Sequence, residues 1–141
     1  IRIIIKAIMN IGNSGTTRMT DDGIWWSSDY YFYRINIYQD NLLNVARYTP
    51  SHTDGTIDDA AAIDGIFMAT CTDIYWREDL FDNWHFYDIS QTYEFRKHGL
   101  RTVFLNDTDI TLLHELSTKP SPVDYYEKYR QIFLNNYDIR Q

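Results

Sequence analysis

The sequence predicts an α/β protein in which a mixed β-sheet is flanked by helices. This prediction rests on three segments, in chain order: an apolar run with β character at 62–70, a helical pattern at 88–99 and an apolar strand at 100–105. A strand, a helix and a further strand in this order form the βα unit from which α/β proteins are built. The clearest helical pattern lies further along the chain, at 121–137.

The first forty residues are predicted to contain short strands joined by turns. Residues 1–11 are apolar with two interspersed cations, which indicates a strand or the end of a helix. Residues 10–23 hold three glycines and show no helical period, so they are interpreted as turns. The next segment, "IWWSS" at 24–28, is interpreted as a short strand. In 30–39, aromatic and β-branched residues alternate at a period of two, which indicates a strand and one arm of a hairpin.

The middle of the chain combines a polar segment with the predicted buried strand. Residues 44–62 are rich in Thr, Ser, Asp and Gly, and they are expected to form a long surface loop. The apolar run at 62–70 is interpreted as a buried strand. Asp64 and Gly65 mark either its start or a bulge at which a ligand approaches the backbone.

Both predicted helices carry recognisable end signals. Helix 88–99 has Arg96 and Lys97 in its last turn, where cations interact favourably with the helix dipole, and a glycine at its end as a natural stop. Helix 121–137 begins at Ser121, which can cap it, and has a proline in its first turn.

Charge and composition argue against several function classes. Thirteen basic and twenty acidic residues give a net charge of −7, which argues against a nucleic-acid or anionic-membrane partner because phosphate contacts need clustered Lys and Arg. The single cysteine, Cys71, is expected to be a small buried hydrophobe in a protein of the reducing cytoplasm. The sequence shows no apolar run of membrane-spanning length, no glycine-rich phosphate loop and no zinc-ligand spacing.

The most unusual segment is "WREDLFDNWHFYDIS", residues 76–90, which combines four carboxylates with five aromatic side chains. Aromatic side chains favour burial, whereas carboxylates resist it unless they are paired. Asp88 lies at the expected start of the helix, so it either caps that helix or acts as a general base at the mouth of a site. A helix N-terminus favours the ionised carboxylate and lowers its pKa unless burial opposes this effect.

Three stretches resemble a bacterial glycosyltransferase-like family related to glycosyltransferase family 2: "IGNSGTTRMTDDGIWW" (11–26), "IDGIFMAT" (63–70) and "WREDLFDNWHFYDISQTYEFRKHG" (76–99). The likeness extends over most of residues 11–115. It implies the GT-A fold, a nucleotide-sugar donor and a glycan acceptor hydroxyl, in an enzyme of cell-surface glycan synthesis. It also implies a Mn²⁺ or Mg²⁺ cofactor, which would offset the charge on the departing diphosphate.

The same resemblance implies roles for individual residues. Family 2 enzymes carry an acidic pair at the start of a helix that ends at a glycine. Here Gly99 is in register, the second acid falls on Asp88, and Tyr87 occupies the first position. The resemblance therefore implies that Asp88 is the catalytic base that deprotonates the acceptor hydroxyl. His114 would reach the metal or the diphosphate, but Glu115 and the lack of a following glycine depart from the family pattern, so a loop histidine without a ligand is an equal alternative.

Further side chains are expected around the sugar. One of the two tryptophans at 25–26 is expected to anchor the fold, and the other to offer a flat apolar platform. Trp76 and Phe81 are expected to pack beneath the site. The expected acceptor- and sugar-binding residues are Asp64, Gly65, Trp26, Trp84 and His85.

A nucleotide-binding half of the GT-A type is not recognisable in the sequence. A βαβ unit ending in an acidic metal-binding turn should precede residue 11, and the paired acids at 20–22 and 57–59 do not follow a buried strand. Residues 1–141 are therefore predicted to be a single or partial domain that forms the acceptor-side half of the fold, with a C-terminal helix within 120–141.

Such a half would have two consequences. An open sheet edge would allow it to pair with a second copy as a homo-oligomer, and weak or no transferase activity is expected of these residues alone. Two alternatives to an enzyme stay open: a non-catalytic carbohydrate-binding domain on the same scaffold, and a structural remnant of one.

Overall fold

The computed structural model describes residues 8–35, 37–40, 45–48, 57–105, 112–115 and 123–140. Within these ranges the chain forms ten short strands, two α-helices and two 3₁₀ helices. Their order is β1 (Ile8–Gly12), β2 (Ser14–Thr16), η1 (Trp25–Ser27), η2 (Tyr30–Phe32), β3 (Tyr33–Ile35), β4 (Ile37–Asp40), β5 (Val45–Tyr48), β6 (Ile57–Asp59), β7 (Ala62–Ile63), β8 (Met68–Thr70), α2 (Tyr87–Lys97), β9 (Arg101–Leu105), β10 (Leu112–Glu115) and α3 (Val123–Asn136).

The largest sheet is mixed and has four strands in the order β6–β9–β1–β8. β1 runs parallel to β9, whereas β8 is antiparallel to β1 and β6 is antiparallel to β9. The chain leaves β8, forms α2 and returns as β9, and α2 packs against β1, β7 and β9. The predicted α/β class, with a mixed sheet and flanking helices, is confirmed.

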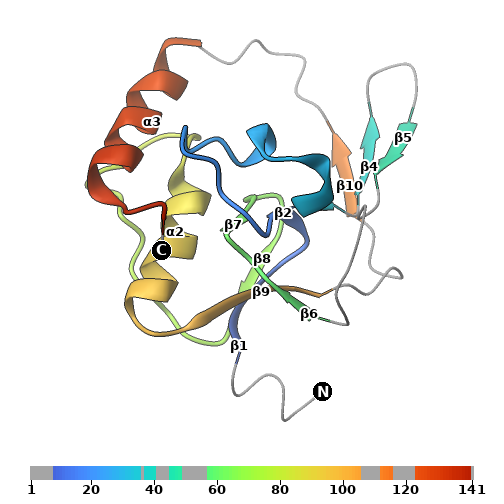
Figure 1. Ribbon diagram of the computed structural model, residues 1–141, viewed down its shortest axis with the longest axis horizontal. Helices are drawn as coiled ribbons and strands as arrows, with labels where there is room; N and C mark the ends of the chain where they lie inside the picture. The colour runs from blue at the N-terminus through green and yellow to red at the C-terminus, as the bar shows by residue number, and fades with distance from the viewer. Residues whose placement is uncertain are drawn as a thin grey trace.

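Two smaller sheets complete the described strands. β2 pairs antiparallel with β3 on one side and β7 on the other. β4 pairs antiparallel with β5 and parallel with β10, and this sheet lies on the side of the molecule away from the helices (Figure 1). β7 of this short β2 sheet ends at Ile63 and leads directly into Asp64 and Gly65, which line the site described below.

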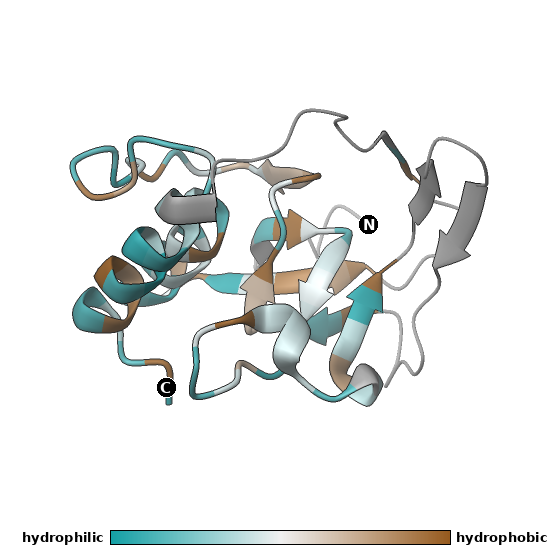
Figure 2. Ribbon diagram, turned by 90° about the horizontal axis from the view of Figure 1, so that it is seen from above, coloured by the Kyte–Doolittle hydropathy of each residue, from teal (hydrophilic) through white to brown (hydrophobic). Residues whose placement is uncertain are grey.

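The helices α2 and α3 lie side by side (Figure 1) and enclose the main hydrophobic core. Hydrophilic and hydrophobic residues are mixed along the helices (Figure 2). In α2 the seven consecutive residues from Ile89 to Phe95 are all buried, so this helix is covered on more than one face. Aromatic rings dominate this contact, and Tyr93 of α2 meets Phe133 of α3 edge-on at 5.1 Å between ring centroids. The buried residues of the core are Trp25, Ala62, Phe81, Phe86, Ile89, Tyr93, Tyr129, Phe133 and Tyr137.

The ends of α2 agree closely with the prediction. The helix begins at Tyr87, one residue earlier than expected. At its end, Gly99 adopts the left-handed conformation with a φ of 71°, and the N–H of Leu100 donates to the carbonyl oxygen of Phe95 over 3.0 Å. This is the Schellman arrangement, which satisfies carbonyls at a helix end and favours glycine at this position.

A buried ion pair links two of the sheets. Arg34 of β3 and Asp58 of β6 are both almost fully buried, and the guanidinium donates to the carboxylate. Arg34 also donates to the carbonyl oxygens of Tyr31 and Tyr33, over 3.1 and 3.0 Å. Both charges therefore have polar partners inside the protein, as buried charges require.

Several predictions for the first half of the chain are wrong, because tertiary packing overrides the local pattern. The expected strand at 24–28 is instead the 3₁₀ helix η1, which turns Trp25 into the helical core. The expected strand at 30–39 starts with η2 and continues as two strands of different sheets, β3 and β4. The expected turns at 10–23 include strand residues of β1 and β2.

The predictions for 44–70 are also wrong in part. The expected loop at 44–62 contains β5, β6 and the first residue of β7. The expected single strand at 62–70 is two strands, because β7 pairs with β2 whereas β8 pairs with β1. Between them the chain turns, and the Asp64 carboxylate accepts a hydrogen bond from the N–H of Ile66 over 3.0 Å. An aspartate that bonds its own backbone two residues on is typical of a turn.

Two side-chain predictions are overturned as well. Cys71 is exposed rather than buried, because it follows β8 at the edge of the described sheet. Trp76 is 44% exposed and does not pack beneath the site, whereas Phe81 is buried as expected.

The predicted cap Ser121 lies outside the described residues. No described helix has the length and apolar character that crossing a bilayer would need.

Candidate active site

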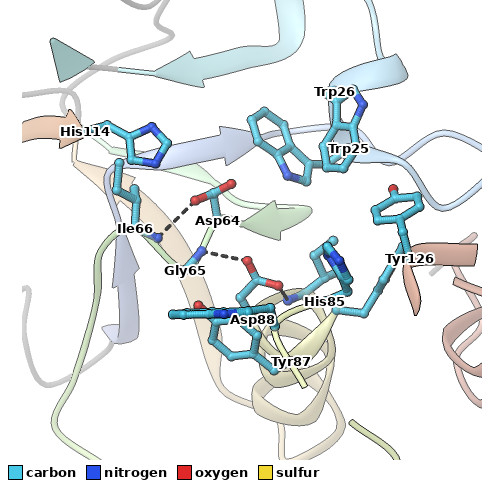
Figure 3. A pocket seen from close by; sticks show the side chains of 13 residues that line it. Trp25, Trp26, Asp64, Gly65, Ile66, His85, Tyr87, Asp88, His114 and Tyr126 are labelled. Atoms are coloured by element: carbon cyan, nitrogen blue, oxygen red, sulfur yellow. Dashed lines mark hydrogen bonds between the residues drawn. The ribbon is translucent and has the colours of Figure 1, made fainter. Parts of the chain in front are cut away.

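A cavity of about 350 Å³ lies where the turn after β7, the start of α2, η1, β10 and α3 come together (Figure 3). It brings together all seven side chains and backbone positions that the sequence singles out for a site. Other residues, which the sequence does not single out, also line this cavity. The lining residues are Trp25, Trp26, Asp64, Gly65, Ile66, Trp84, His85, Phe86, Tyr87, Asp88, Ile89, His114 and Tyr126.

Asp88 lies at the first turn of α2 and is held by two backbone N–H groups. One carboxylate oxygen accepts from the N–H of Gly65 over 2.7 Å, and the other accepts from the N–H of Ile89 over 2.8 Å. The first bond ties the helix to the turn after β7, twenty-three residues away in sequence. The N-cap residue of α2 is Phe86, so Asp88 lies inside the first turn rather than at the cap. Its carboxylate links this turn to Gly65, which lines the same cavity.

The pKa of Asp88 is raised from 3.8 to about 7. Burial is the main cause, and the negative charge of Asp64 adds to it. The two backbone N–H groups act in the opposite direction but do not prevail. Burial thus outweighs the expected effect of the helix N-terminus, and it brings this carboxylate into the pKa range in which a general base works best at neutral pH.

Asp64 and His114 face each other across the other end of the cavity (Figure 3). Burial raises the pKa of the Asp64 carboxyl, while the N–H of Ile66 and the nearby imidazole of His114 favour its ionised form. His114 comes from β10, which belongs to a different sheet from β7. The histidine that the sequence left open as a loop residue is therefore a strand residue beside a carboxylate.

Gly65 has a steric role that the sequence analysis did not foresee. A Cβ atom at this position would lie 2.8 Å from Cζ of Tyr87, even closer to its hydroxyl oxygen, and 3.2 Å from Cβ of Asp88. The missing side chain allows the start of α2 to approach the turn, so that the N–H of Gly65 reaches the Asp88 carboxylate. The close approach at Gly65 is made by the protein itself.

Aromatic rings form the remaining wall. Trp25 is buried and meets Trp26 edge-on at 5.6 Å between ring centroids, while Trp26 is 49% exposed. This division matches the expectation that one tryptophan anchors the fold and the other offers a surface. Tyr126 of α3 contacts Trp26 and His85 at centroid distances of 5.5 and 5.3 Å.

His85 adds an imidazole to this aromatic wall. Burial lowers the pKa of His85 below its ordinary value of 6.5. The ring is therefore neutral at physiological pH, and it supplies a hydrogen-bonding edge without a positive charge.

The described residues do not form a metal centre. No three His, Cys, Asp or Glu side chains in the described ranges are grouped closely enough to hold an ion. Asp64 and His114 supply one carboxylate and one imidazole to the cavity. Mg²⁺ is usually held by one or two carboxylates together with substrate phosphates rather than by an all-protein cage, so the expected Mn²⁺ or Mg²⁺ stays a prediction.

Tyr87, Phe86 and Tyr126 are the principal site residues that sequence reasoning missed. Tyr87 enters the sequence analysis only as a departure from an acidic position, yet it is the first residue of α2 and lines the cavity. Phe86 has a left-handed backbone with a φ of 64°, which is rare for a bulky residue and sets the direction in which α2 begins. Tyr126 belongs to α3, and the docking of this helix brings it to the cavity.

Comparison with known protein families matches residues 6–137 to a family described as "Glycosyltransferase like family". No curated protein and no solved structure matches the chain. The match covers nearly the whole chain and includes every lining residue of the cavity. The chain therefore belongs to the glycosyltransferase-like family.

Proposed function

We propose that the protein transfers a sugar from a nucleotide-sugar donor to an acceptor hydroxyl, with Asp88 as the general base. The observation that carries this proposal is the position of Asp88, which lies in the cavity wall and is held by two N–H groups from different elements. Its raised pKa supports the role, because the carboxylate can accept a proton near neutral pH and is still largely ionised above pH 7.

The reaction would be a single displacement. Asp88 removes the proton from the acceptor hydroxyl while that oxygen forms a bond to the anomeric carbon of the donor sugar. The bond between the anomeric carbon and the diphosphate oxygen breaks, and the nucleoside diphosphate leaves with the electron pair. One base and a direct attack invert the configuration at the anomeric carbon, as family 2 relatives mostly do.

The cavity suits the acceptor better than the diphosphate of the donor. Among the described residues, its lining contains the carboxylates of Asp64 and Asp88, the imidazoles of His85 and His114, and no Lys or Arg. A diphosphate needs cationic or metal partners, whereas a sugar hydroxyl needs hydrogen-bonding edges and an apolar surface. The acceptor hydroxyl is therefore assigned to this cavity, and the need for Mn²⁺ or Mg²⁺ stays a prediction from the family.

Sugar transfer by variants tests the proposal. The purified protein is incubated with UDP- and GDP-sugars, Mn²⁺ and neutral oligosaccharide acceptors, and the product is measured by mass spectrometry. Asp88→Asn should reduce kcat by about 100- to 10,000-fold while donor binding is retained. Asp73→Asn is the matched control, because Asp73 is exposed and lines neither this cavity nor its neighbours. Normal turnover by Asp88→Asn would remove Asp88 from the role of base.

A carbohydrate-binding domain without catalysis is the second candidate. It is favoured by one observation, the exposure of Trp26 and Trp84 in the lining of the cavity, where they offer flat apolar faces to a sugar. Calorimetry separates the two functions. Binding of UDP that depends on Mn²⁺ supports the transferase, whereas binding of plain oligosaccharide without any nucleotide binding or transfer supports the binding domain.

A further inference from the structure

A second cavity, of about 810 Å³, adjoins the first. The two share Trp84 and Tyr87 in their linings, so these rings stand at the junction between them. Trp76 and Glu78 line the far side, and Asn83 lies beside the junction. A ligand that extends out of the first cavity past Trp84 and Tyr87 would enter the second.

The tryptophans of this cavity are exposed although the protein has a core to bury them. Trp84 is 79% exposed and Trp76 is 44% exposed. The Tyr87 ring contacts both of them, at centroid distances of 5.9 Å to Trp76 and 6.4 Å to Trp84. Isolated exposed aromatic residues are common, but two tryptophans joined by a third ring around one cavity form a continuous apolar surface.

Planar polar side chains border this surface. Glu78 and Asp82 offer carboxylates, and Asn83 accepts from the N–H of Trp84 over 2.7 Å through its side-chain oxygen while its side chain also bonds the Tyr129 hydroxyl. Flat aromatic faces bind the C–H face of a sugar ring, and planar carboxylate and amide groups bind its hydroxyls. The second cavity therefore has the composition of a carbohydrate site.

Charge disfavours the main competing ligand, a phosphorylated one. Among the described residues, the lining of the second cavity has two carboxylates, Glu78 and Asp82, and no Lys or Arg. The adjacent Arg77 donates to both oxygens of Asp79, over 2.8 and 2.7 Å. Lys128 lies over the Tyr129 ring, 4.8 Å from its centroid, and its charge already acts on Asp82. A phosphate in this cavity would therefore meet two carboxylates and compete with them for these cations.

We propose that the second cavity binds the sugar next to the one that reacts, so that the acceptor is a neutral oligosaccharide of at least two residues. This inference rests on the proposed function, because it requires that the first cavity takes the reacting end of the acceptor. The chain of sugars passes Trp84 and Tyr87 at the junction and lies against Trp76.

The test measures how binding depends on the length of the oligosaccharide. Neutral gluco-, galacto- and manno-oligosaccharides of one to four residues are titrated into the protein by calorimetry. Affinity should rise by about tenfold or more from one residue to two or three in the series that is recognised. Trp76→Ala should remove most of this rise and leave the affinity for the monosaccharide unchanged. In transfer assays it should raise KM for longer acceptors with little effect on kcat.

Two further variants keep the test decisive. Tyr75→Ala is the matched control, because Tyr75 is the exposed aromatic neighbour of Trp76 and lines neither cavity. It should behave like the unchanged protein. Glu78→Ala removes an exposed carboxylate without disturbing the packing of Trp76, and it should also weaken only the longer ligands.

The outcomes separate this inference from the proposed function. If affinity does not rise with length, or if Trp76→Ala and Glu78→Ala leave the rise intact, the second subsite is wrong even when Asp88→Asn abolishes transfer. If a protein partner or a phosphorylated compound occupies the second cavity instead, the inference is also overturned. If neither transfer nor any sugar binding is found, the proposed function fails and this inference falls with it.

Discussion

Asp58 is buried and Asp88 is partly buried at a cavity, and the protein compensates their charges in different ways. Asp58 lies between two sheets and is paired with Arg34, so a full positive charge balances it. Asp88 lies at the cavity, where its carboxylate accepts hydrogen bonds from backbone N–H groups, and the charge that acts on it is that of another carboxylate, Asp64. An opposite charge therefore balances the Asp58 carboxylate, whereas a charge of the same sign acts on the Asp88 carboxylate.

This difference indicates what each carboxylate does. A buried, paired charge serves the arrangement of the fold, because its partner has to be in place. A carboxylate whose pKa is raised by burial and by a like charge is costly at neutral pH, and such groups gather at functional sites. The contrast can be tested by changes at each position, beginning with the largest expected effect on stability.

Arg34→Met should destabilise the protein by about 3–5 kcal/mol, because it leaves the Asp58 carboxylate buried without its cation. Urea unfolding followed by circular dichroism measures the effect. Arg101→Met is the matched control, since it breaks the exposed pair with Asp59, the next residue along β6, and should cost less than about 1 kcal/mol. The double variant Arg34→Met/Asp58→Leu should recover much of the loss. Equal costs for the two arginine variants would contradict a structural role for the buried pair.

Gly65→Ala should destabilise the protein by about 1–3 kcal/mol through overpacking against Tyr87. The turn can relieve the clash only by moving away from α2, which would lengthen the hydrogen bond from the N–H of Gly65 to Asp88. That change should also raise the pKa of Asp88 further, since this N–H favours the ionised form. Thermal unfolding measures the first effect, and carboxyl NMR titration measures the second. An unchanged pKa would show that the turn does not hold the carboxylate.

Asp88→Asn should change how stability depends on pH. The folded protein binds the Asp88 proton more tightly than the unfolded chain does, so between pH 3.8 and about 7 it holds more protons. Stability therefore falls as pH rises through this window, by at most about 1.4 kcal/mol per unit, and the whole cost is present above pH 7. Removing the carboxylate should remove this fall and make the variant more stable at pH 8 by about 1–2 kcal/mol.

The control and the contrary outcome for this change are simple. Denaturant unfolding at pH 5, 6, 7 and 8 is compared with that of Asp73→Asn, which should follow the unchanged protein. A variant that is less stable than the unchanged protein at pH 8 would mean that the Asp88 carboxylate stabilises the fold. Asp88 would then stabilise the fold as Asp58 does, and the contrast between the two carboxylates would be wrong.

The sequence predicted correctly those elements that are determined by residues close together in the chain. Helix α2 and its stop at Gly99 follow from helical spacing, terminal cations and a glycine that can adopt a positive φ. The 3₁₀ helix at Trp25 could not be predicted, because β-type residues bend there to reach a core built by distant helices. The residues of the site were singled out largely by resemblance, but the contact of Gly65 with Tyr87 exists only when the turn and α2 are brought together.

The variant with the smallest expected effect, Tyr126→Phe, extends the contrast from carboxylates to hydroxyl groups. The Tyr137 hydroxyl donates to Glu94 over 2.7 Å, whereas the buried Tyr126 hydroxyl has no hydrogen-bond partner among the described residues. Tyr137→Phe should therefore cost about 1–3 kcal/mol, and Tyr126→Phe should be neutral or stabilise by less than about 1 kcal/mol, because removing an unsatisfied polar group loses no bond. Urea unfolding of both variants measures the difference. If Tyr126→Phe is as costly as Tyr137→Phe, the Tyr126 hydroxyl has a hydrogen-bond partner in the folded protein, and the contrast does not extend to the hydroxyl groups of the site.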